Sequence, residues 1–107
     1  MIISGGTNVF PKDIEEVIVQ HPAVREVAVF GVPSEKWGET PLAAVILHPS
    51  GAITAEALRD WINERVDAKN QRISAVAIMA DFPRSTAGKT LKRILREPYW
   101  VGRHEKI

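Results

Sequence analysis

The chain alternates between short apolar runs and longer stretches in which apolar residues recur three or four positions apart. Runs bounded by Gly, Pro or polar residues predict strands; they are residues 1–3, 24–32, 41–47 and 75–79. The three-to-four spacing follows Pro11, Thr54 and Leu91, and it predicts three helices at these places. The predicted order of elements is therefore β-α-β-β-α-β-α.

The run 24–32 is apolar on both faces, because Val27 and Val29 point one way while Ala28 and Phe30 point the other. Such a strand is expected to be covered on both sides.

Turn signals predict where the two central strands end. Residues 31–33, Gly-Val-Pro, are expected to end the first strand before a polar loop over 34–40, and Pro41 is expected to start the next. The short connection predicts that the two strands are antiparallel neighbours.

These elements predict an α+β domain, with a small mixed sheet of about three main strands plus a short N-terminal strand, packed with three helices that cover one face. Thr54 is the expected N-cap of the middle helix. In the last helix, Leu91, Ile94 and Leu95 are expected to be buried, and Pro98 is expected to stop it. Residues 1–100 form the predicted domain, and residues 101–107 a flexible tail.

Composition narrows the class of protein. A chain of 107 residues is one domain by length. It has no Cys, and its His residues stand alone at 21, 48 and 104, so no metal site is expected. No apolar run approaches the ~20 residues of a membrane span, and residues 4–6, Ser-Gly-Gly, interrupt any signal peptide. We therefore expect a cytoplasmic protein without a membrane span.

Charge is uneven along the chain. Residues 1–80 carry seven basic and ten acidic side chains, whereas residues 81–107 carry seven basic and three acidic ones. The positive C-terminal part indicates either an anionic partner or simply a solvated basic helix face.

The segment 81–99 holds the candidate chemistry. Lys89 follows Gly88 on a loop of small polar residues, and a lysine is a point charge on a flexible stem, suited to a phosphate or a carboxylate. A Walker loop is one interpretation, but Pro83 stands where that motif has its first Gly, and Pro lacks an N–H for a phosphate cradle. Only 17 residues follow Thr90, too few to complete a doubly wound sheet.

Two long motifs suggest a different interpretation. Residues 83–93 read Pro-Arg-Ser-Thr-Ala-Gly-Lys-Thr-Leu-Lys-Arg. They resemble the catalytic-lysine motif near the C-terminus of adenylate-forming enzymes, a superfamily that includes acyl-CoA synthetases, peptide-synthetase adenylation domains and beetle luciferases. Residues 3–15 read Ile-Ser-Gly-Gly-Thr-Asn-Val-Phe-Pro-Lys-Asp-Ile-Glu and are similar to the family's Ser-Gly-Gly-x-x-x-x-Pro-x-x-Ile-Glu motif. Shorter matches in the same order are His21-Pro22-x-Val24, Ala28-Val29-x-Gly31-x-Pro33 and Trp37-Gly38-Glu39. Together they cover roughly residues 1–100.

The resemblance implies a C-terminal lid domain of an acid–CoA ligase. Such an enzyme uses ATP with Mg²⁺ to form an acyl-adenylate and then CoA to form a thioester. By analogy Lys89 would be catalytic in the first step, with Arg84 and Gly88 in the mobile loop that supports it. Ser4, Gly5 and Gly6 would face CoA in the second step.

The resemblance also implies partners. The acid and ATP would bind to a large N-terminal adenylation domain, which this sequence does not contain. We therefore expect the isolated chain to be inactive and to bind no cofactor alone.

Two alternatives remain. The chain could come from a peptide-synthetase adenylation domain, although residues 91–96, Leu-Lys-Arg-Ile-Leu-Arg, favour a CoA ligase. It could also be a non-enzymatic module that binds anions or nucleic acid. Its aromatic residues do not interleave with its basic ones, so no nucleic-acid partner is expected.

Overall fold

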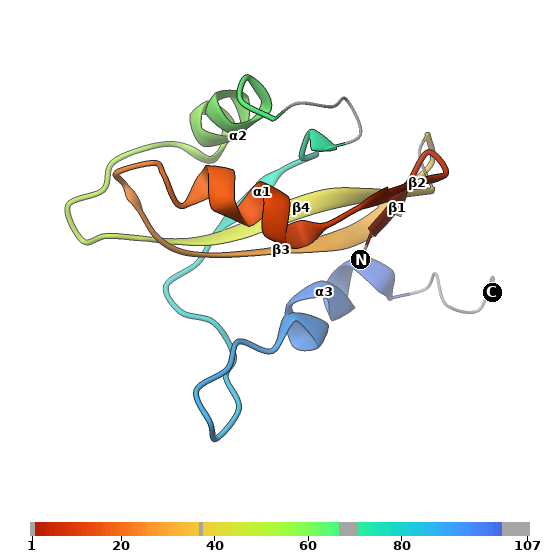
Figure 1. Cartoon of the computed structure of the whole chain (residues 1–107). Helices are drawn as coiled ribbons and strands as arrows, with labels where there is room; N and C mark the ends of the chain where they lie inside the picture. Colours follow the sequence, from red (N-terminus) through yellow and green to blue (C-terminus); the bar gives the residue numbers. More distant parts are fainter. Residues whose placement is uncertain (1, 37, 67–70, 102–107) are drawn as a thin grey trace.

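The computed structural model describes residues 2–36, 38–66 and 71–101, and it contains two small sheets. The main sheet has the order β3 (Val24–Ser34), β4 (Gly38–Leu47) and β5 (Val76–Ile78) (Figure 1). β3 and β4 are antiparallel and β4 and β5 are parallel, so the sheet is mixed as predicted. The predicted α+β class is confirmed.

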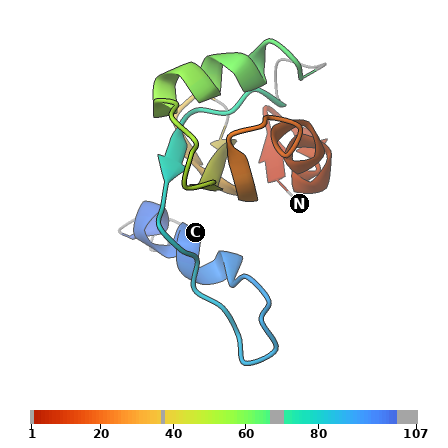
Figure 2. The same ribbon diagram turned by 90° about the vertical axis from the view of Figure 1, so that its left-hand side faces the viewer.

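The helices lie on both sides of the main sheet. α1 (Pro11–Ile18) and α2 (Ala55–Asn63) lie on one side, and α3 (Lys92–Trp100) lies on the other (Figures 1 and 2). The expectation that all three helices cover one face was wrong. The strand that is apolar on both faces was the better guide, since each of its faces needs a cover.

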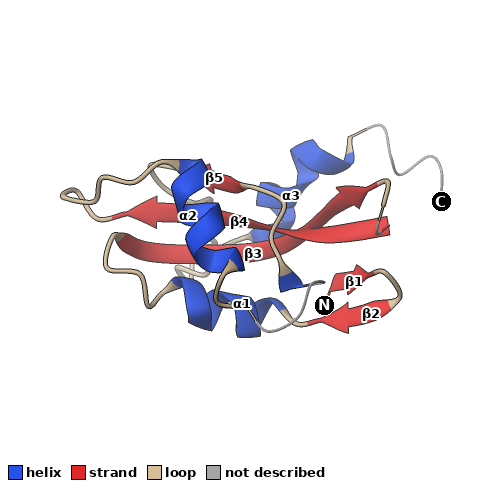
Figure 3. Ribbon diagram, turned by 90° about the horizontal axis from the view of Figure 1, so that it is seen from above, coloured by secondary structure: helices blue, strands red, loops and turns tan. Residues whose placement is uncertain are grey.

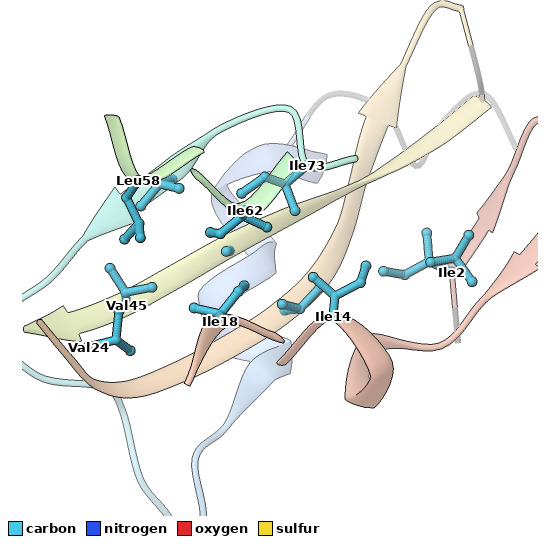
Figure 4. Packing of buried hydrophobic residues seen from close by; sticks show 12 residues of the cluster. Ile2, Ile14, Ile18, Val24, Val45, Leu58, Ile62 and Ile73 are labelled. Carbon is cyan, nitrogen blue, oxygen red and sulfur yellow. The ribbon is translucent and has the colours of Figure 1, made fainter. Parts of the chain in front are cut away.

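Alternate residues of β3 and β4 feed two separate cores, because successive side chains of a strand point to opposite faces. Under α1 and α2 the buried side chains are Ile2, Val9, Ile14, Ile18, Val24, Val29, Ala43, Val45, Leu58, Ile62, Ile73 and Val76 (Figure 4). Beside α3 they are Ala28, Phe30, Val32, Leu42, Ala44, Ile46, Phe82 and Leu95. Each fully buried large apolar side chain stabilises the fold by about 1.5–3 kcal/mol.

The β3–β4 hairpin is longer than the sequence predicted. Its ladder continues from Gly31 opposite Pro41 to Ser34 opposite Gly38, so residues 31–33 do not end β3 and Pro41 does not begin β4. Proline lacks an N–H, so a sheet tolerates it on edge strands and beyond the end of a ladder. Pro33 is on the edge strand β3, and Pro41 lies outside the three residues of β4 that pair with β5.

Strand β2 (Thr7–Val9) was not predicted from the sequence; it pairs with β1 (Ile2–Ser4) in an antiparallel hairpin (Figure 3). Gly5 and Gly6 form its two-residue turn, with φ angles of 59° and 80°. Two positive φ angles are typical of a type I′ turn, for which Gly-Gly is a known signal. Only Val9 of β2 is buried, so the strand has no apolar alternation that could have revealed it.

The helix ends agree in part with the predictions. Thr54 caps α2 as predicted, since the N–H of Ala57 donates to Thr54 Oγ1 over 3.1 Å. In α3, Leu95 is buried but Ile94 is 43% exposed, and the helix passes through Pro98 to Trp100, contrary to prediction. Pro98 stands in the last turn, where little helix remains to be disrupted. Among the described residues, no helix is both long and apolar enough to span a membrane.

Candidate functional site

The loop that carries Lys89 is a short hairpin, residues 84–90, which we call the lysine loop. Arg84 and Thr90 pair across it, the N–H of Ser85 donates to the carbonyl of Lys89 over 2.8 Å, and the N–H of Gly88 donates to the carbonyl of Ser85 over 2.9 Å. Gly88 closes the turn with a φ of 83°. The lysine loop extends away from the main sheet on the side of α3 (Figures 1 and 2).

Lys89 is exposed beside the tip of this loop. Its main-chain N–H donates to Ser85 Oγ over 3.3 Å, which holds the backbone of Lys89 and leaves the side chain out of the turn. Within the described ranges, no carboxylate pairs with its ammonium group. The charge is therefore available to an anion from outside the domain.

The geometry argues against a Walker loop. A phosphate cradle needs backbone N–H groups that point at the ligand. Here the N–H groups of Ser85, Gly88 and Lys89 are already donated within the turn.

Arg84 fixes the base of the lysine loop. Its Nη2 lies 3.0 and 2.9 Å from the two carboxylate oxygens of Glu26 on β3, and 3.1 Å from Asp81 Oδ1. The hydrogen bonds to Glu26 and then Asp81 raise the pKa of Arg84 further above its ordinary value. The pKa of Asp81 is lowered, first by the N–H of Phe82 and next by Arg84.

The lowered pKa predicts a direction for acid sensitivity. Asp81 should contribute stability above its ordinary pKa of 3.8 and lose that contribution as pH falls through its lower folded value. The free energy of unfolding of Asp81→Asn should therefore fall below that of the wild type at neutral pH, and the two should converge in acid. Denaturant titrations at several pH values measure this difference. A constant difference down to pH values well below 3.8 would contradict the assignment.

The β1–β2 hairpin, which the Gly5-Gly6 turn closes, lies beyond one end of the main sheet, whereas the lysine loop projects from the α3 side of the sheet (Figure 1). Gly5 and Gly6 are exposed, and a Cβ added to Gly6 would meet nothing within 4 Å. Ser4 is only 1% exposed, so its side chain belongs to the packing beneath the hairpin. The structure therefore does not bring the two groups of predicted site residues together.

Three residues that hold distant segments of the fold together were not predicted from the sequence as site residues. Glu26 holds Arg84, Glu15 pairs with Lys92, and Trp100 Nε1 donates to the carbonyl of Gly31 over 2.9 Å. Each joins segments far apart in the chain, and only Glu15 had a signal, as the last residue of the Ser-Gly-Gly motif.

No group of three His, Asp or Glu side chains that could hold a metal occurs among the residues described. His21, which was not expected from the sequence to be a metal ligand, accepts the N–H of Ala23 through Nδ1 and packs edge-on against Trp61 with ring centroids 4.7 Å apart. The predicted tail lies outside the described residues from position 102 onward.

Comparison with known proteins identifies the family. Residues 13–89 match the AMP-binding enzyme C-terminal domain. The chain belongs to this family. The match starts within the Ser-Gly-Gly motif and ends at Lys89, so the family resemblance stated from the two motifs is confirmed.

The relatives of this AMP-binding enzyme C-terminal domain are CoA ligases. The chain is 37% identical to the medium/long-chain-fatty-acid–CoA ligase FadD8 of Mycobacterium tuberculosis, over 95% of this chain and 19% of that protein. It is 40% identical to the 2-succinylbenzoate–CoA ligase of Bacillus cereus, over 91% and 20% respectively. Among solved structures, ATP-bound MatB from Rhodopseudomonas palustris superposes with a TM-score of 0.85 and 36% identity, over 92% of this chain and 20% of that one. The chain thus spans about a fifth of the length of these relatives.

Proposed function

We propose that this domain is the lid of an acid–CoA ligase, and that Lys89 acts in the adenylation step. The observation that carries the proposal is the exposed ammonium group of Lys89 on a hairpin whose base is fixed to β3 through Arg84. The CoA ligases among the relatives support the choice of CoA over a peptide-synthetase carrier protein as acceptor.

In the proposed reaction, a carboxylic acid attacks ATP and gives an acyl-adenylate and pyrophosphate, and CoA then displaces AMP to give a thioester. Negative charge gathers as the carboxylate approaches the α-phosphate. A cation that is already in place stabilises this charge without a reorganisation cost, which is the role proposed for Lys89. Mg²⁺ would be bound with ATP rather than by this domain.

We assign the second step to the Gly5-Gly6 turn. The turn exposes backbone that no Cβ covers, so a thin pantetheine chain could approach it closely. Because the turn lies beyond one end of the sheet and the lysine loop projects from the α3 side, the domain would have to rotate to present them in succession to the same active site. ATP and CoA are cytoplasmic metabolites, and we propose that compartment for the enzyme.

A domain exchange tests the proposal. The C-terminal fifth of the B. cereus 2-succinylbenzoate–CoA ligase would be replaced by this chain, and formation of the CoA ester from 2-succinylbenzoate, ATP and CoA would be measured. We expect activity from the fusion, and none from the truncated ligase or from the 107-residue chain alone. A stable, folded fusion without activity would count against the proposal, and so would pyrophosphate exchange by the isolated chain.

A further inference from the structure

Glu15 on α1 contacts two other elements of the fold. Its Oε2 accepts the N–H of Val29 on β3 over 2.8 Å and lies 2.7 Å from Nζ of Lys92 on α3. The side chain of Glu15 is 22% exposed and that of Lys92 is 41% exposed, so the pair is partly shielded from water. One carboxylate thus joins α1, the edge of β3 and the start of α3.

The start of α3 needs such a partner. Lys92 is the first residue of the helix, where the partial positive charge of the helix dipole disfavours a cation. The helix has no side-chain N-cap hydrogen bond and no acidic residue in its first turn. The carboxylate of Glu15 supplies the negative charge that the sequence of α3 itself lacks.

The start of α3 also lies at the base of the lysine loop. Lys92 follows Lys89 by three residues, and the N–H of Leu91 donates to the carbonyl of Pro83 over 2.9 Å, which closes the base of the loop. The other arm of the loop is held by Arg84 on Glu26. Both arms of the loop are thus connected to β3. Arg84 binds Glu26 on the strand directly, whereas Lys92 is connected through Glu15 to Val29, about 10 Å further along the strand.

We propose that Glu15 is a positioning residue for Lys89: through Lys92 it fixes the second arm of the lysine loop, as Glu26 fixes the first through Arg84. The proposal rests on the function proposed for Lys89. It assigns to the last residue of the N-terminal motif a role in the chemistry of the C-terminal one, although 74 positions separate Glu15 from Lys89.

The test uses Glu15→Gln in the ligase fusion. Gln keeps an acceptor for the Val29 N–H but removes the charge that holds Lys92. We expect kcat for adenylation to fall about tenfold with little change in KM for the acid, because a misplaced group can cost up to ~100-fold while ground-state binding is untouched. Lys92→Met should have the same effect, and the double variant should be no slower than either single one. Glu16→Gln is the matched control, since Glu16 is the exposed next residue of α1 and has no ion pair among the residues described.

The decisive arm repeats Glu15→Gln in a Lys89→Ala background. A positioning role requires that Glu15→Gln then has no further effect, because the group that it positions is gone. A residue that only stabilises the fold would slow both backgrounds by the same factor, and this outcome would overturn the proposal. An unchanged rate in Lys92→Met would overturn it as well.

Amide exchange in the 107-residue chain separates this proposal from the proposed function. The N–H groups of Ile94 and Leu95 donate to the carbonyl of Leu91 in the first turn of α3. Glu15→Gln should speed their exchange roughly two- to fivefold, the scale of a partly exposed ion pair, relative to the amides of β4. If Lys89→Ala leaves the fusion active, the proposed function fails whatever the exchange shows. If exchange in α3 is unchanged, the inference about Glu15 fails even where Lys89 is essential.

Discussion

Lys89→Ala in the ligase fusion should slow acyl-adenylate formation roughly 100-fold or more, the scale of losing one preorganised charge donor. Thioester formation from supplied acyl-adenylate and CoA should remain largely intact, because the adenylation step is then bypassed. The physical reason is the exposed ammonium group of Lys89, which has no ion pair among the described residues and is proposed to act on the reacting phosphate. Single-turnover assays of each half-reaction separate the two effects.

Two controls sharpen this test. Lys12→Ala removes a different exposed lysine, which lies on α1, and should leave both half-reactions unchanged. Lys89→Arg keeps the charge but replaces a compact ammonium with a broader planar group, and it should recover only part of the adenylation rate. Equal losses in both half-reactions after Lys89→Ala would mean that the lysine loop serves the whole cycle rather than one step.

Local patterns predicted most of the elements and some of their ends. Thr54 marked the start of α2 because an N-cap is a property of neighbouring residues. The predicted end of β3 and start of β4 were wrong, because residues 31–33 were interpreted as a break and Pro41 as the first residue of a strand. In the fold Gly31 and Pro41 stand opposite one another within the continuous β3–β4 ladder.

The candidate site divides in the same way. The lysine loop was predictable, since Gly88 and Lys89 lie in one contiguous motif. The contacts that hold the loop were not, because Glu26 meets Arg84 across 58 positions of sequence. Many basic residues in the sequence are possible partners for a given carboxylate, and only the fold determines which of them lies beside it.

The edge of β3 illustrates what the sequence could not reveal. A free strand edge presents unpaired N–H and C=O groups that could pair with another chain. Here Glu15 accepts the N–H of Val29, and Trp100 donates to the carbonyl of Gly31. The edge strand thus receives contacts from α1 and from the end of α3. These contacts occupy backbone groups of the edge and also hold α3 in place.

Gly6→Leu should give the opposite result to Lys89→Ala. A side chain at Gly6 would be strained by the φ of 80° but would meet no other atom of the domain, since nothing lies within 4 Å of its Cβ position, so it would obstruct a ligand at the turn. We expect thioester formation from supplied acyl-adenylate to fall roughly 100-fold, the cost of a displaced reacting group. Adenylation should change little, because the lysine loop lies apart from the turn, on the α3 side of the sheet (Figure 1).

Gly6→Ala separates obstruction from strain. Its backbone has the same φ of 80°, at which any L side chain is strained, but it adds only a methyl group. Backbone strain alone would slow Gly6→Ala and Gly6→Leu alike, whereas obstruction requires Leu to be much the slower. Circular dichroism and denaturant titration would confirm that both variants fold. If Gly6→Leu impaired adenylation as strongly as thioester formation, the Gly5-Gly6 turn and the lysine loop would not serve separate steps, and the proposed rotation would lose its support.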